Sequence, residues 1–338
     1  MIKKLRLDFL DATKGVAILC ITLLHIEDGV FPVWLNTWIG LFMITTFYFT
    51  SGWISYGKKE SVSVRHFFMK RLRQLGIPYI SFSLLIFLFE LIWITLGFMQ
   101  LNILYRDVYK VLTFRGIGTL WFLPVLLFSE TLFLFIRTSK YKRYYLLLFF
   151  CMTLMISYLY NTYWIPKLGD STYLKLIDSP IRPWVQTLAA WPVVAVGYAF
   201  AKYIWPFLSV WKSYLKVLSG VIVLILSMLW VTFPPFELYF FNGFLSNILP
   251  AVGFVLLFSG LGWMDLRFLT YWGRNSLILM ATHFSITEVI VRTFDRYILG
   301  HELCRGPITL VYFVVIVLFT YLWVYLFNHP LRFALGRK

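Results

Sequence analysis

Apolar residues are gathered along the chain into ten long runs, separated by shorter segments that carry most of the charged side chains. Each run is close to the roughly 20 apolar residues that a helix needs to cross a bilayer. Because lipid offers the backbone no hydrogen-bond partners, such a run must be helical. The pattern predicts a single all-α, polytopic membrane domain over 1–338 with about ten transmembrane helices, at 9–27, 34–56, 75–98, 119–136, 144–160, 183–201, 215–233, 244–263, 271–292 and 307–327.

Composition supports this fold class. Hydrophobic residues make up 60% of the chain and charged residues 14%, whereas soluble domains average about 45–50% and about 25%. A soluble enzyme and a disordered chain are therefore excluded. The three cysteines are scattered in no pattern typical of a metal site or a disulfide framework, so we expect no metal.

Lysine and arginine are divided unevenly between alternate loops. With a cytoplasmic N-terminus, ten spans return the C-terminus to the same side, and 22 of the 31 Lys and Arg residues then lie on cytoplasmic segments. Positive charge gathers on that side of membrane proteins. We therefore predict cytoplasmic termini and a multi-pass protein of the cell (plasma or inner) membrane. The net charge of +16 is explained without a nucleic-acid partner.

The first predicted span carries ionisable residues, which are costly at membrane depth and are functional candidates for that reason. Lys14 and His25 are 11 positions apart, so they share one helix face, separated by about 16 Å along the axis. Asp11 lies about 40° from that line. A neutral imidazole can accept a proton from an attacking hydroxyl. The alternative is that Lys14 anchors the helix and His25 makes an interhelical hydrogen bond.

A second basic cluster, Lys70, Arg71 and Arg73, precedes the third span. Guanidinium groups bind phosphate with two parallel hydrogen bonds, so this cluster is a candidate phosphate-binding mouth. Anchoring of the helix end at the cytoplasmic surface explains the same residues.

Two later spans add polar candidates. Ser276 and His283 are 7 positions apart and share a helix face, with Asn275 directly before them. In the fourth span, Trp121 lies near the outer end and Glu130 lies deeper. These residues are candidates to line or support a cavity, although a structural hydrogen bond and an interfacial tryptophan are the plainer interpretations.

The ordered series of these motifs resembles the acyltransferase 3 family of integral membrane O-acyltransferases over nearly the whole chain. Two positions depart from the family pattern, since Lys14 stands where Arg is frequent and Lys70-x-x-Arg73 stands for Arg-x-x-Arg. The segments that carry the resemblance are Leu10-Asp11-Ala-Thr-Lys14-Gly15 with Leu23-Leu24-His25, Phe47-Tyr-Phe-Thr-Ser51-Gly52-Trp53, Phe68-Met-Lys70-Arg71-Leu-Arg73 with Pro78-Tyr79, Leu120-Trp121-Phe122-Leu123, and Gly273-Arg274-Asn275-Ser276 with His283.

The resemblance implies transfer of a short acyl group, most often acetyl, from cytoplasmic acyl-coenzyme A to a hydroxyl of a cell-surface glycan or a lipid-linked sugar. His25 would be the general base, and Asp11 would orient it or balance charge. The coenzyme A phosphates would be bound by Lys14, Lys70, Arg71 and Arg73. The cavity would be lined or supported by Trp121, Glu130, Asn275, Ser276 and His283.

Two other functions remain open from the sequence. Intramembrane His and Glu also serve proton relays, so a proton-coupled transporter or flippase of a glycan precursor is the main alternative. A glycan polymerase is the second.

Overall fold

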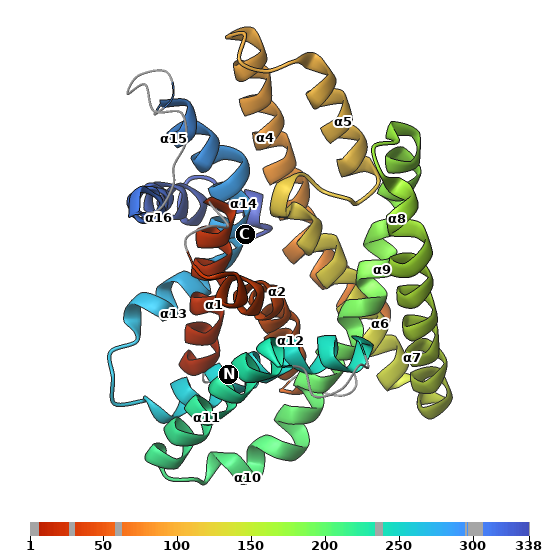
Figure 1. The fold of residues 1–338 in the computed structure, drawn as a ribbon, viewed down its shortest axis with the longest axis vertical. Coiled ribbons are helices and arrows are strands. Elements are labelled where there is room, and N and C mark those ends of the chain that lie inside the picture. The colour runs from red at the N-terminus through yellow and green to blue at the C-terminus, as the bar shows by residue number, and fades with distance from the viewer. Residues whose placement is uncertain are drawn as a thin grey trace. The chain divides into compact units, whose positions relative to one another are not determined.

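The structure, a computed structural model, describes residues 7–26, 31–57, 63–233, 239–294, 296 and 307–337. These residues form helices and turns, with no strand among them (Figure 1). Each of the ten predicted ranges falls on helical structure, which confirms the all-α class. The long helices are α1 (Asp8–Ile26), α2 (Val33–Tyr56), α4 (Ile77–Thr95), α6 (Phe122–Thr138), α7 (Lys142–Leu159), α9 (Thr172–Ala199), α11 (Ser213–Thr232), α12 (Tyr239–Gly260) and α16 (Pro307–Asn328).

Eight helical segments in the described part of the chain are long and apolar enough to cross a membrane. The predicted ranges 34–56 and 244–263 lie outside these eight, on α2 with 24 residues and on α12 with 22 residues. Helices of this length and hydropathy require lipid around them. The protein is a multi-pass membrane protein.

Two predicted spans differ in detail from the structure. The ninth is divided at Asn275, between α13 (Arg267–Arg274) and α14 (Ser276–Thr282). It continues through η5 (His283–Glu288), a π-helical segment, into α15 (Val289–Phe294).

The sixth span begins at Thr172 rather than at 183. The charged residues Asp178 and Arg182 lower the hydropathy of its first turns, but they pair with each other at 3.1 Å, so the helix continues through them.

The helices group into two compact units. Unit 1 comprises 1–57, 196–283 and 287–321, and unit 2 comprises 58–195, 284–286 and 322–338. Each unit is therefore built from segments that are far apart in the sequence.

In unit 1, α1 packs against α2, α12, α13 and α14, and α11 pairs with α12. Glycine lets α1 and α13 touch backbone to backbone. A Cβ at Gly15 would overlap the backbone of Leu269, and one at Gly273 would overlap that of Asp11. Small residues at such crossings are how membrane helices approach closely. The unit also contains η4 (Phe200–Ile204) and α10 (Trp205–Ser209).

In unit 2, α7 and the segment that precedes α4 pack against α6. Helix α4 packs against α5 (Leu101–Leu112). The preceding segment is α3 (Val64–Arg71) followed by the π-helical η1 (Leu72–Gly76). The shorter elements of the unit are η2 (Gly118–Trp121), η3 (Tyr160–Trp164), α8 (Ile165–Leu168) and η7 (Arg332–Leu335).

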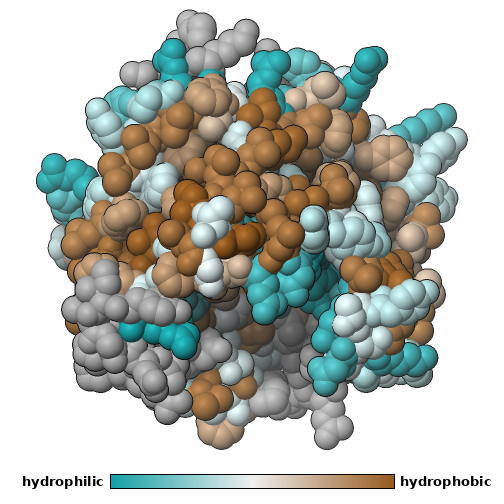
Figure 2. Space-filling model, turned by 90° about the horizontal axis from the view of Figure 1, so that it is seen from above, coloured by the Kyte–Doolittle hydropathy of each residue, from teal (hydrophilic) through white to brown (hydrophobic). Residues whose placement is uncertain are grey.

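Several helices present apolar side chains outward. Only 11% of the apolar window is buried in the segment that contains α7 and in α11, and residues such as Leu147 and Leu226 are exposed. Figure 2 shows broad areas of hydrophobic residues on the face seen. A helix that is apolar on its exposed side is suited to contact with lipid tails.

Candidate active site

The first candidate group lies on α1, in unit 1. Because α1 is one helix from Asp8 to Ile26, Lys14 and His25 lie on the same face, separated by about 16 Å along the axis. Lys14 and His25 are both half-buried. The helix thus carries a cation near its first turns and an imidazole in its last turn, as the spacing predicts.

The His25 ring is oriented by its own helix. Its Nδ1 lies 2.7 Å from the carbonyl oxygen of Ile21. A carbonyl only accepts hydrogen bonds, so Nδ1 carries the proton and donates it. In the neutral ring the lone pair is then on Nε2, which is the nitrogen that can act as a base.

A second imidazole lies against the first. His283 is 1% exposed, and its Nδ1 donates to the carbonyl oxygen of Leu279 at 2.7 Å. Its Nε2 is 3.4 Å from Nδ1 of His25. The two ring centroids are 5.1 Å apart at an interplanar angle of 66°. His283 is the first residue of the π-helical η5, a helix type that is frequent at functional sites.

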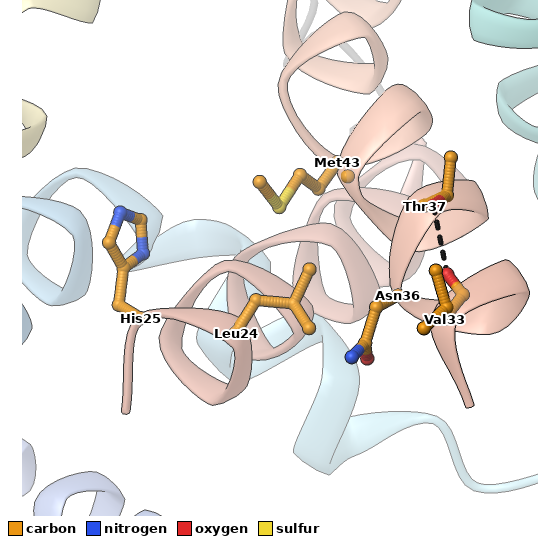
Figure 3. Close-up of a pocket in the computed structure, with 7 residues that line it drawn as sticks. Leu24, His25, Val33, Asn36, Thr37 and Met43 are labelled. Atoms are coloured by element: carbon orange, nitrogen blue, oxygen red, sulfur yellow. Dashed lines mark hydrogen bonds between the residues drawn. The ribbon is translucent and has the colours of Figure 1, made fainter. Parts of the chain in front are cut away.

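A cavity of about 490 Å³ adjoins His25. Its lining comes from the end of α1 and the start of α2, with no Lys, Arg, Asp or Glu among the described residues. Figure 3 shows Met43 extending from α2 toward the side on which His25 lies. A space of this size can hold a monosaccharide-sized group. The lining residues are Leu24, His25, Val33, Asn36, Thr37, Gly40 and Met43.

Asp11 lies in an ionic cluster at the other end of α1. It is 4% exposed, and its carboxylate is 2.7 Å from Nζ of Lys14 and 3.4 Å from Nε of Arg274. Arg274 also contacts Asp8 at 2.8 Å. Arg274 thus pairs with two carboxylates of α1.

This placement distinguishes the two roles expected of Asp11. Fourteen positions along α1 separate it from His25 by about 21 Å, so Asp11 is too far away to orient the ring. Balancing the charge of Lys14 is the role that the geometry supports. The close α1–α13 crossing at Gly15 and Gly273 explains why Arg274 reaches Asp11.

Asn275 and Ser276 lie at the break between α13 and α14. Nδ2 of Asn275 donates to the carbonyl oxygen of Tyr271 at 2.9 Å, and Ser276 is half-buried at the start of α14. Seven positions place Ser276 about 10 Å before His283 along the helical path. Asn275 thus shapes the turn that leads into the helix of His283.

The remaining predicted residues belong to unit 2. Arg71 binds Glu130 through two hydrogen bonds between its guanidinium and the carboxylate, which joins α3 to α6. Lys70 and Arg73, on either side of Arg71, are exposed. Of the three cations in this cluster, Arg71 is the one with a carboxylate partner among the described residues, and the pair accounts for Glu130 as well.

Trp121 ends η2 and lines a second cavity, of about 270 Å³. Sequence reasoning singled out Trp121 but missed its charged neighbours in this cavity, Lys110, Arg115 and Arg182. The one sequence signal for them is the i, i+4 spacing of Asp178 and Arg182. No group of three or more His, Cys, Asp or Glu side chains within the described ranges could hold a metal ion.

Comparison with protein families gives one assignment. The family model described as an acyltransferase domain, of the acyltransferase 3 type, matches residues 7–329. Neither the search of curated proteins nor the search of solved structures found a significant match. The family match spans both units and includes every candidate residue described above. The chain therefore belongs to the acyltransferase 3 family and is a multi-pass membrane O-acyltransferase.

Proposed function

We propose that this enzyme transfers a short acyl group, in the form of acetyl, from acyl-coenzyme A to a hydroxyl of a cell-surface glycan or lipid-linked sugar in the cell membrane. The observation that carries the proposal is the hydrogen bond that His25 Nδ1 donates to the carbonyl oxygen of Ile21. In the neutral ring, which lines the cavity, this bond places the lone pair on Nε2, the nitrogen that can accept a proton.

The reaction requires one proton acceptor and no oxidant or reductant. His25 Nε2 takes the proton from the acceptor hydroxyl as its oxygen attacks the thioester carbonyl. The tetrahedral intermediate then expels the thiolate of coenzyme A, the C–S bond breaks, and the imidazolium returns the proton to sulfur. The products are an acyl ester and free coenzyme A.

His283 supports this base in the proposed mechanism. Its Nδ1 proton is held by Leu279, so its Nε2 presents a lone pair toward the protonated Nδ1 of His25 at 3.4 Å. That polarity matches the positive charge that His25 acquires during proton transfer. We assign His283 as a positioning residue.

The donor phosphates would be bound by cations of α1, α3 and η1. Lys14 pairs with Asp11 at 2.7 Å, and Lys70 and Arg73 are exposed. Arg71 is held by Glu130, so its contribution would be to fix α3 rather than to bind phosphate with its whole fork.

The test uses the full chain purified in lipid nanodiscs with [14C]acetyl-coenzyme A and a panel of glycans and lipid-linked sugars. We expect label to enter a hydroxyl ester, and His25→Ala to reduce the turnover number by about 10²–10⁴-fold. His329→Ala changes an exposed histidine and is the matched control.

Retention of near-normal turnover by His25→Ala would refute the general-base assignment. No ester from any acceptor, together with movement of the sugar across proteoliposomes, would favour the transporter alternative instead.

A further inference from the structure

The cavity in unit 2 is lined by cations on several elements. Lys110 comes from α5, Arg115 from the loop before η2, and Arg182 from α9. Trp121 and Gln186 complete the side-chain lining, and no carboxylate belongs to it among the residues that the structure describes. Its volume of about 270 Å³ is several times the roughly 30 Å³ share of one water molecule, so it has room for a sugar ring or a phosphate group.

A buried carboxylate behind the lining fixes the two arginines. Oδ2 of Asp178 lies 2.9 Å from Arg115 and 3.1 Å from Arg182. Oδ1 of Asp178 accepts hydrogen bonds from Tyr160 at 2.6 Å and Trp164 at 3.0 Å. Asp178 is thus saturated with donors, and it holds two guanidinium groups with a single negative charge.

The two guanidinium groups repel each other in this arrangement. Burial, followed by the positive charge of Arg182, lowers the pKa of Arg115. The side chains of Arg115 and Arg182 remain 26% and 31% exposed, so a ligand can reach them. An anion placed between the two guanidinium groups would relieve their repulsion. It would also accept hydrogen bonds from the N–H groups that do not donate to Asp178.

Lys110 has a carboxylate of its own. Asp107 lies 2.7 Å from Lys110 and 3.1 Å from Arg106, and the carboxyl of Glu90 is near that of Asp107. This acidic pair lies outside the lining. The strongest anion-binding position of the cavity is therefore at Arg115 and Arg182, with Lys110 at its edge.

Two further features point to a sugar rather than a bare ion. Oε1 of Gln186 is buried and has no hydrogen-bond partner within the described part of the chain, so it can accept a ligand hydroxyl. Trp121 is the aromatic residue of the lining, which also includes Gly116 and Gly118, whose φ angles of +67° and +51° suit glycine. A Cβ at Gly116 would overlap the backbone of Trp121.

We propose that this cavity binds an acidic saccharide, with its carboxylate or phosphate at Arg115 and Arg182, its ring against Trp121, and a hydroxyl donated to Gln186. This proposal rests on the proposed function, in which a glycan accepts the acyl group. A carboxylate and a phosphate both present negatively charged oxygens to the guanidinium groups. The test distinguishes between these two groups.

Binding is measured by isothermal titration of the full chain in nanodiscs with glucuronic acid, glucose 1-phosphate and methyl glucoside. We expect at least one acidic probe to bind about tenfold or more tightly than the neutral one. The preferred acidic probe identifies the group. Equal binding of the three probes, or no saturable binding of either acidic probe, would overturn the proposal.

Gln186→Glu tests the same point without removing an existing contact, because it adds a negative charge to the lining and leaves Asp178 with its arginines. We expect it to weaken the acidic probe about tenfold or more and to spare methyl glucoside. Arg115→Gln should have the same effect, while Arg143→Gln, an exposed arginine of the same unit, is the control. Unchanged acidic-probe affinity in Gln186→Glu would contradict the site.

The titration is independent of acyl transfer. His25→Ala should bind the acidic probe with wild-type affinity even though its rate of acyl transfer is strongly reduced. Failure of acyl transfer with probe binding intact would count against the proposed function alone. Failure of probe binding with acyl transfer intact would count against the saccharide site alone.

Discussion

The two cavities differ in the chemistry of their walls. The cavity of unit 1 combines His25 with amide, hydroxyl and apolar groups, whereas that of unit 2 combines three cations with a tryptophan and an amide. A general base must be neutral to accept a proton, and nearby fixed charge would alter its protonation. An anion site needs the opposite, which is several fixed cations. Among the described residues, the unit 1 cavity therefore suits the proposed proton transfer and the unit 2 cavity suits the proposed anion binding.

The largest expected effect is the loss of kcat on substitution of His25, which lines the cavity of unit 1. His25→Ala should lower kcat by about 10²–10⁴-fold, and a saturating acceptor should not restore it. Gln186→Glu should leave kcat near the wild-type value and weaken the binding of the acidic saccharide instead. Initial rates over a matrix of acceptor concentrations measure kcat, and isothermal titration measures the binding. A loss of kcat from Gln186→Glu would contradict the separation.

Filling the unit 1 cavity should have the next largest effect. Gly40 lines it, and a Cβ there meets nothing within 4 Å, so the Cβ of Gly40→Leu is accommodated, and Leu also has the higher helix propensity. We expect kcat/KM to fall by about tenfold to a hundredfold because the acceptor hydroxyl is displaced. Thermal unfolding should be unaffected. The control is Gly262→Leu, since Gly262 is also open but lines neither cavity. Full activity of Gly40→Leu would place the acceptor elsewhere.

Changes at His283 should have a moderate effect that falls on kcat. His283→Ala removes the imidazole that contacts the His25 ring, and we expect about a tenfold loss of kcat with donor KM unchanged. His283→Gln keeps a polar acceptor and should recover part of the rate. Steady-state kinetics with the donor varied distinguish this from general destabilisation. Equal kcat in the wild type and His283→Ala would remove His283 from the mechanism.

The smallest effect is expected at Lys14. Lys14→Met should raise the donor KM by up to about tenfold, because Asp11 keeps Arg274 as a partner while one phosphate-binding charge is lost. Lys14→Arg keeps the charge and should stay close to wild type. Acetyl-coenzyme A titration in nanodiscs measures the change. An unaltered donor affinity in Lys14→Met would exclude Lys14 from donor binding.

Much of the fold follows from the sequence because lipid leaves the backbone few choices. All ten apolar ranges are helical, since each backbone group in lipid must bond within its own segment. The start of α9 was missed because hydropathy treats Asp178 and Arg182 as interruptions, although they neutralise each other. The break at Asn275 was also missed, because apolar runs do not mark a turn between two helices.

The candidate site was predictable where one helix carries it. Lys14 and His25 share a face because both lie on α1. The meeting of His25 with His283, 258 positions away, was not derivable from spacing. Nor was the binding of Arg71 to Glu130, 59 positions away, which changes the expected use of that arginine.

The sequence by itself determined the helices, the multi-pass class, the family and the common face of Lys14 and His25, because these depend on local periodicity and short motifs. Tertiary structure decided which charges are already paired, which imidazole lies against His25, and which residues share a cavity. Pairing across long sequence separation depends on how helices pack, and packing follows from side-chain volume and close glycine crossings such as Gly15 with Gly273. The local sequence pattern therefore does not predict which residues that are distant in the sequence come into contact.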